Sequence, residues 1–235
     1  VLVSSLTVWD AIADTVGGAW AGWHGRGGRT NHPEDYAEYV QGCDVASFDI
    51  YPAVHDRPEV AGKLWYVPRG VSRLREWTAG KRLVWNCIEC TRISNVNVKP
   101  TPAQVKAEVW MALIHGSQGL IYFVHQFKPS FIEAGLLADP EMAAAVGLVN
   151  KQIHELAPVL NSPTVEDAIT VKADPADVSP ERAKLLHEGP LATLVKRHDG
   201  ATYVFAVRME DSPAAATFSL SSIAGDVSAE VIGEN

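Results

Sequence analysis

The chain has 235 residues, enough for one large domain or two smaller ones. Its 47% hydrophobic and 20% charged residues are typical of a folded globular protein, and no stretch is long and apolar enough to cross a bilayer. The formal net charge is −8 and the basic residues are scattered, so nucleic acid and membrane surfaces are disfavoured as partners. The opening residues lack a basic leader and read as folded, soluble chain; secretion stays open, because a leader could have been removed.

The first part of the chain alternates short apolar segments with helical ones. The predicted strands are 1–8, 43–51, 82–89 and 119–127. The predicted helices are 33–40, 63–80, 101–116 and 139–158. This alternation, with nearly continuous apolar strands, predicts a parallel sheet with helices packed outside it. We therefore expect an α/β fold in which residues 1–163 form a partial, half TIM-type β/α barrel of about four β/α units.

Two of these helices carry clear boundary signals. Thr101 is the expected N-cap of the third helix, with Pro102 at the first helical position and Gln104 at the capping-box position. Asp139 is the expected cap of the fourth helix, and Pro158 is expected to end it.

After residue 163 the pattern changes to short segments with alternating polarity. The predicted strands lie within 165–173, 191–209, 214–223 and 227–234, and His198-Asp199-Gly200 is predicted to be a hairpin turn. We expect a small antiparallel, β-sandwich-like domain over residues 164–235.

The cysteines do not indicate a disulfide framework, because there are only three: Cys43, Cys87 and Cys90. Cys87 and Cys90 form a C-x-x-C, but they fall on opposite faces of a predicted strand and no second pair follows. We interpret them as structural. The 8 histidines are also scattered, so we expect no metal site and no cofactor.

Polar side chains gather where the predicted strands of the first part end. They are Asp49, Tyr51, Glu89, His125 and Gln126. In a β/α barrel, catalytic groups come from these carboxyl ends. Taken singly, Asp49 is a possible helix cap, Tyr51 a strand terminator before a proline, and His125 a packing residue. Glu89 ends an apolar run, and no helix that it could cap begins directly after it, so we predict that it is functional.

Aromatic side chains accompany these groups, namely Trp85, Phe123 and Phe127. Carboxyl groups beside aromatic rings suit sugar chemistry. A glycosidase needs one carboxyl to protonate the leaving oxygen and another to attack the anomeric carbon or activate water.

Four segments together resemble the C-terminal half of the (β/α)8 retaining glycoside hydrolases of clan A: DVASFDIYP, VWNCIECT, AEVWMALIHGSQGLIYFVHQF and LAPVLNSP. They are most similar to β-galactosidase-like and cellulase-like members with a small β domain after the barrel. The resemblance covers roughly residues 35–235. It implies that 49–52 ends strand six, that Glu89 is the nucleophile at the end of strand seven, and that 122–127 forms strand eight.

The resemblance does not extend to the acid/base residue. In that clan it is a glutamate that follows an asparagine at the end of strand four, and no Asn-Glu pair precedes residue 43. Glu133 is the first candidate for this role, with Glu34, Asp35 or a carboxylate of a partner chain as alternatives. A complete barrel takes about 250 residues, so the chain is either a piece of a longer enzyme or a natural half barrel. Because a half barrel exposes two sheet edges, we expect a homodimer that completes the barrel.

The glycine-rich loop 23–36 has no phosphate-binding motif, and we place Trp23, His24, Arg26 and Arg29 near the sugar at the rim. The leading prediction is a retaining glycoside hydrolase with a carbohydrate substrate. Its catalytic carboxyls are expected about 5 Å apart, whereas roughly 6.5–9.5 Å indicates inversion. The predicted catalytic residues are Glu89, Asp49 and Glu133, and the predicted substrate-binding residues are Tyr51, Trp23, Arg26, His125, Gln126 and Trp85. The alternatives are a non-catalytic carbohydrate-binding or structural remnant, and a lyase or isomerase that uses Glu89 as a base.

Overall fold

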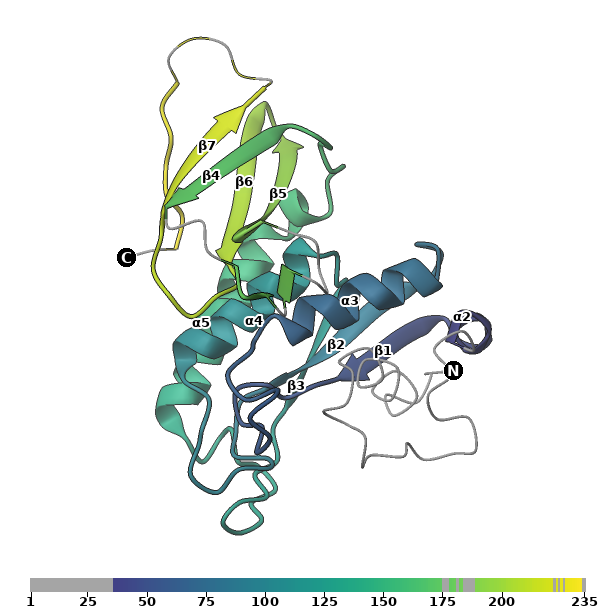
Figure 1. Cartoon of the computed structure of the whole chain (residues 1–235), viewed down its shortest axis with the longest axis vertical. Coiled ribbons are helices and arrows are strands. Elements are labelled where there is room, and N and C mark those ends of the chain that lie inside the picture. The colour runs from purple at the N-terminus through teal and green to yellow at the C-terminus, as the bar shows by residue number, and fades with distance from the viewer. Residues whose placement is uncertain are drawn as a thin grey trace.

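The computed structural model describes residues 36–174 and, with gaps at 181, 184–188, 222, 224 and 226, residues 178–233. The described chain is mixed α/β, with a three-stranded parallel sheet followed by antiparallel strand pairs (Figure 1). This confirms the predicted order of a parallel α/β part and an antiparallel β part. The first predicted strand, 1–8, and the start of the first predicted helix lie outside the described residues.

The parallel sheet has the order β1-β2-β3, with strands Val45–Asp49, Leu83–Glu89 and Gly119–Phe123. Cys87 of β2 pairs with Asp49 of β1, and Glu89 pairs with Phe123 of β3. The carboxyl ends of the three strands therefore meet at one edge of the sheet, as the sequence predicted.

The helices that follow these strands lie on one side of the sheet, between it and the antiparallel strands (Figure 1). They are α3 (Tyr66–Trp77), α4 (Pro102–Ile114) and α5 (Pro140–Leu160), and a short α2 (Tyr36–Tyr39) with a 3-10 turn (Val40–Gly42) precedes β1. Alternate strand residues such as Phe48, Val84 and Ile88 are completely buried within the core that the strands and helices share. Complete burial of each such side chain stabilises the fold by about 1.5–3 kcal/mol.

The observed ends of α4 and α5 can be compared with the capping residues and the terminating proline that the sequence predicts. The Thr101 side chain accepts a hydrogen bond from the Gln104 backbone N–H while the Gln104 side chain accepts from the Thr101 N–H, so the capping box is confirmed. Asp139 caps α5 as predicted. The prediction that Pro158 ends α5 is wrong, because the helix continues to Leu160. Pro158 lacks the N–H that would bond within the helix, and the helix ends two residues after it.

The antiparallel part consists of two strand pairs. β4 (Ile169–Asp174) pairs with β7 (Ala215–Leu220), and β5 (Leu191–His198) pairs with β6 (Ala201–Arg208). The turn between β5 and β6 has positive φ angles at Asp199 (47°) and Gly200 (77°), which confirms the predicted hairpin and fits a type I′ turn. The strand predicted at 227–234 is wrong as far as it is described: residues 227–233 are largely exposed and pair with no strand.

The antiparallel strands pack directly on α4 and α5. The Trp110 ring of α4 stacks on Phe205 of β6 with 5.6 Å between ring centroids, and Ala192 and Met209 belong to the same core as the parallel sheet. This contact makes the two parts share one hydrophobic core.

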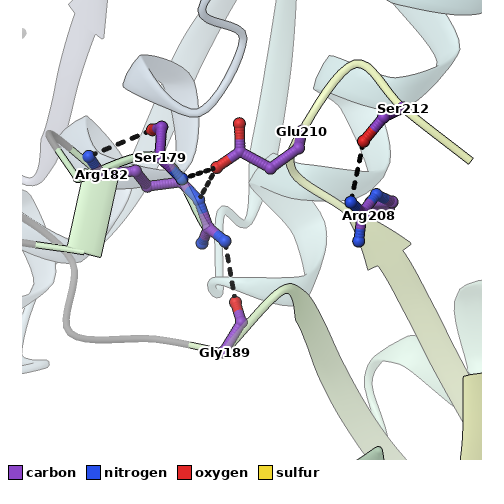
Figure 2. Close-up of polar contacts among 6 residues, drawn as sticks. All are labelled: Ser179, Arg182, Gly189, Arg208, Glu210 and Ser212. Carbon is purple, nitrogen blue, oxygen red and sulfur yellow. Dashed lines mark hydrogen bonds and ion pairs between the residues drawn. The ribbon is translucent and has the colours of Figure 1, made fainter. Parts of the chain in front are cut away.

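A buried ion pair fastens the segment before β5 to the end of β6 (Figure 2). Arg182 is fully buried, and its Nε donates to Glu210 Oε1 at 2.8 Å while its Nη2 donates to the Gly189 carbonyl at 3.0 Å. The Ser179 backbone N–H donates to the same Glu210 oxygen at 2.9 Å. Truncating either partner of such a pair leaves the other charge buried and uncompensated.

Within the part of the chain that is described, no helix is long and apolar enough to span a membrane.

Candidate functional site at the carboxyl end of the parallel sheet

Glu89 is the last residue of β2, and its side chain is 0% exposed. The loop after β1 folds over it and donates two backbone hydrogen bonds. The Ala53 N–H donates to Oε1 at 2.6 Å and the Val54 N–H to Oε2 at 2.8 Å. The two amides fix both the position and the rotation of this carboxyl group.

A second buried glutamate, Glu108 of α4, faces Glu89. Glu108 is also 0% exposed, and no N–H or O–H donor of the described residues reaches either of its oxygens. Two carboxyl groups in contact cannot both be charged without water, so they share a proton. The pair therefore holds a proton between its two carboxyl groups.

The electrostatics of the pair follow from this burial. Burial raises the pKa of Glu89 to about 7, while the hydrogen bond with Glu108 and the two amide hydrogen bonds oppose the rise. Burial and then the charge of Glu89 raise the pKa of Glu108 well above its usual range. The adjacent Cys90 thiol donates to the Phe123 carbonyl at 3.0 Å, and burial raises its pKa to about 12. Glu89 consequently titrates near neutral pH.

Asp49, Tyr51 and Cys87 form a second cluster beside Glu89. Asp49 is half-buried at the end of β1, and the Tyr51 hydroxyl is buried close to it. Burial, followed by the Asp49 charge, raises the pKa values of Tyr51 and of Cys87, the latter to about 12. Tyr51 thus stays a neutral phenol that is able to hydrogen-bond a carboxylate or a sugar hydroxyl.

Aromatic rings line the same edge beyond Tyr51. The Phe123 ring centroid lies 5.2 Å from Tyr51, 5.6 Å from His125 and 5.9 Å from Phe127. Phe131 continues the series at 5.6 Å from Phe127. Phe127 and Phe131 are 45% and 61% exposed, so these rings offer an accessible apolar platform that continues from the Phe123 ring.

The loop after β3 supports this platform. The His125 Nδ1–H donates to the Glu133 carbonyl at 2.6 Å, and Gln126 forms two backbone hydrogen bonds with Ile132. The Glu133 side chain itself is exposed, and its carboxylate makes no hydrogen bond with a described residue. His125 therefore lies at the rim as predicted, whereas the backbone of Gln126 is engaged in shaping the loop.

The remaining predicted residues lie elsewhere. Trp85 is four residues upstream of Glu89 and covers Gly119, where an added Cβ would lie 2.4 Å from the indole nitrogen. Its ring is therefore placed about 13 Å along the strand from the rim. Trp23 and Arg26, like Glu34 and Asp35, lie outside the described residues.

Sequence reasoning missed Glu108. A signal was present, because Glu108 stands three residues after Val105 and four before Ala112, within the apolar face of α4. A glutamate in such a stripe indicates a buried carboxyl that needs a partner. The described residues contain no group of three or more His, Cys, Asp or Glu side chains arranged to hold a metal ion.

Comparison with known protein families, with curated proteins and with solved structures finds no match to this chain.

Proposed function

We propose that this chain is a carbohydrate-active hydrolase that cleaves glycosidic bonds at the carboxyl end of the parallel sheet, with Glu89 as its central carboxyl group. The observation that supports this most is the position of Glu89 at a strand end, where two backbone amides hold it. Glu89 pairs with Phe123, whose ring lies 5.9 Å from the exposed ring of Phe127. A glycosidase combines these two elements: a fixed carboxyl and a flat apolar surface for the sugar ring.

A nucleophilic carboxyl group must be ionised, and the surroundings of Glu89 allow this. The amides of Ala53 and Val54 favour its charged form, and with a pKa of about 7 it is partly ionised at neutral pH. In the ionised form it would attack the anomeric carbon, and Asp49 with Tyr51 would bind the sugar hydroxyls. A second carboxyl must protonate the leaving oxygen, and retention needs it about 5 Å from Glu89. Glu133 remains our candidate among the described residues.

Whether a sugar can reach Glu89 distinguishes this proposal from a second one, in which the site binds carbohydrate without cleaving it. Because Glu89 is completely buried, a sugar reaches it only when the 53–54 loop moves away. This burial favours the alternative that the rim binds carbohydrate without cleaving it, with Glu89 and Glu108 fastening the loop to the sheet.

We further propose that the sheet is part of a half β/α barrel that a second copy of the chain completes. The order β1-β2-β3 places β1 and β3 at the two edges of the described sheet, where further strands would add. Light scattering of the purified chain tests this, and a monomer at micromolar concentration contradicts it.

The test of function is hydrolysis of a panel of nitrophenyl glycosides by the wild type, Glu89→Gln and Tyr51→Phe. A Phe218→Ala variant is the matched control, because Phe218 is an exposed aromatic residue of β7. We expect turnover of at least one glycoside, a loss of about a thousandfold or more in Glu89→Gln, and an unchanged rate in Phe218→Ala. Tyr51→Phe removes only a hydroxyl, so it keeps the test valid if Glu89→Gln fails to fold.

Sugar binding is measured on the same proteins by the fluorescence of their tryptophans. Binding without turnover, weakened by Phe127→Ala, supports the non-catalytic alternative. A folded wild type that neither cleaves nor binds any sugar of the panel contradicts both.

A further inference from the structure

A cleft of about 790 Å³ lies at the opposite end of the parallel sheet. It is bordered by the end of α4, the end of α5, the segment 161–169 and strand β5. Leu83 and Gly119, the first residues of β2 and β3, also line it. Since β2 is seven residues long, the cleft is separated from Glu89 by about 20 Å.

Two cationic side chains from different elements line this cleft, Arg75 of α3 and Lys196 of β5. Lys196 is only 8% exposed, and its ammonium group donates to the Ser162 carbonyl at 2.8 Å and to Thr164 Oγ1 at 3.0 Å. These two bonds leave the third N–H of the ammonium group available to a ligand. Arg75 donates to the Gly116 carbonyl through Nη1 at 3.4 Å, which leaves most of its five donors for other partners.

Neither cation forms an ion pair with a carboxylate in the part of the chain that is described. Their charges are nevertheless close enough to act on each other. Burial lowers the pKa of Lys196, the charge of Glu166, which also lines the cleft, opposes this shift, and Arg75 adds a smaller lowering effect. The cleft is thus lined by two cations from different elements and by two carboxylates, Glu166 and Asp167, of one loop.

The backbone at Gly116 leaves room for the guanidinium group of Arg75. Gly116 has a φ of 94°, and an added Cβ there would lie 2.2 Å from Arg75 Nη1. Any side chain at position 116 would therefore displace Arg75, and the glycine that ends α4 also allows Arg75 to lie across this turn.

We propose that this cleft is a binding site for a small organic oxyanion, whose carboxylate or phosphate group pairs with Arg75 and Lys196. An anion placed between the two cations relieves their repulsion and satisfies their remaining donors. The volume fits a ligand of the size of one or two sugar rings, and the hydroxyls of Thr164 and Thr193 line the same space. This site is separate from the carboxyl end of the sheet, so it does not rest on the function proposed there.

The test is a titration of the ¹⁵N-labelled full chain with inorganic phosphate, with D-glucuronate and with neutral D-glucose, followed by amide chemical shifts. We expect saturable shifts at residues 162–166 and 193–196 with one or both anions, and none with glucose. Binding of phosphate alone identifies a phosphoryl group as the ligand chemistry, and binding of glucuronate alone identifies a carboxylate.

Variants assign the binding to the two cations. Arg75→Gln and Lys196→Met are each expected to weaken binding by about tenfold or more, whereas Lys172→Met, an exposed lysine of β4, leaves it unchanged. Arg75 is exposed, so Arg75→Gln is expected to fold even if Lys196→Met does not. Absence of saturable shifts with both anions up to about 10 mM, or equal affinity in Arg75→Gln, overturns the proposal.

Discussion

Replacing Glu108 with glutamine should change how the stability of the fold depends on pH. In the wild type, the pKa of Glu89 is about 7 in the folded chain against a usual value of 4.5. Between these pH values the folded state keeps a proton that the unfolded chain has released, so stability falls as pH rises. For Glu89 alone, the shift of roughly 2.5 units corresponds to a loss of about 3 kcal/mol across this window.

Glu108 adds to the loss in this window and extends it to higher pH, because its pKa in the folded state lies well above the usual range. The amide of the Glu108→Gln variant cannot ionise but still offers an N–H to Glu89. The variant should therefore be less stable than the wild type at about pH 5, by about 1–3 kcal/mol, because its second amide N–H has no partner. Above pH 7 its stability should level off while that of the wild type continues to fall.

The measurement is urea denaturation, followed by tryptophan fluorescence, at intervals from about pH 5 to pH 9. Glu155→Gln is the control, since this glutamate of α5 is exposed and should leave the pH profile parallel to that of the wild type. A wild-type stability that is constant between pH 5 and pH 8, or a Glu108→Gln profile that falls as steeply as the wild type above pH 7, refutes the shared proton.

Three further substitutions test other parts of the structure. Gly119→Ala should destabilise the fold by about 1–3 kcal/mol, because the new methyl group displaces the Trp85 indole. Urea denaturation measures this change. An unchanged unfolding midpoint contradicts the close packing of Trp85 on Gly119. Thr101→Ala should cost about 1 kcal/mol by removing the capping box of α4, and a loss below the error of the same assay speaks against a role for the cap. Phe131→Ala should leave the unfolding midpoint nearly unchanged, because the ring is largely exposed. The same variant should bind sugar about tenfold more weakly in a fluorescence titration. Full affinity in this variant removes Phe131 from the proposed platform.

The parts of the fold that local chemistry determines could be predicted from the sequence. The Thr101 capping box and the Asp199-Gly200 turn depend on neighbouring residues, and both are confirmed. The strand ending at Glu89 follows from an apolar run of ordinary strand length, and it is also confirmed.

The surroundings of Glu89 could not be predicted in the same way. Its hydrogen bonds come from Ala53 and Val54, 36 and 35 residues earlier, and backbone amides have no signature in the sequence. The strand predicted at 227–234 failed for a related reason: its alternating pattern is compatible with a strand, but a strand also needs a neighbour to pair with, and residues 227–233 lie beside none. The polarity pattern of a segment shows which secondary structure it can form, and its long-range contacts determine whether that structure forms.

Helix α4 touches both parts of the molecule, and this limits how the chain can be dissected. One of its faces carries Glu108 against the end of β2, and another carries Trp110 against Phe205 of β6. A recombinant fragment that stops near residue 163 would leave Trp110 facing water, together with the helix surface that the antiparallel strands cover. We expect such a fragment to be poorly soluble. Modular engineering of this protein should therefore carry α4 and the β5–β6 hairpin together.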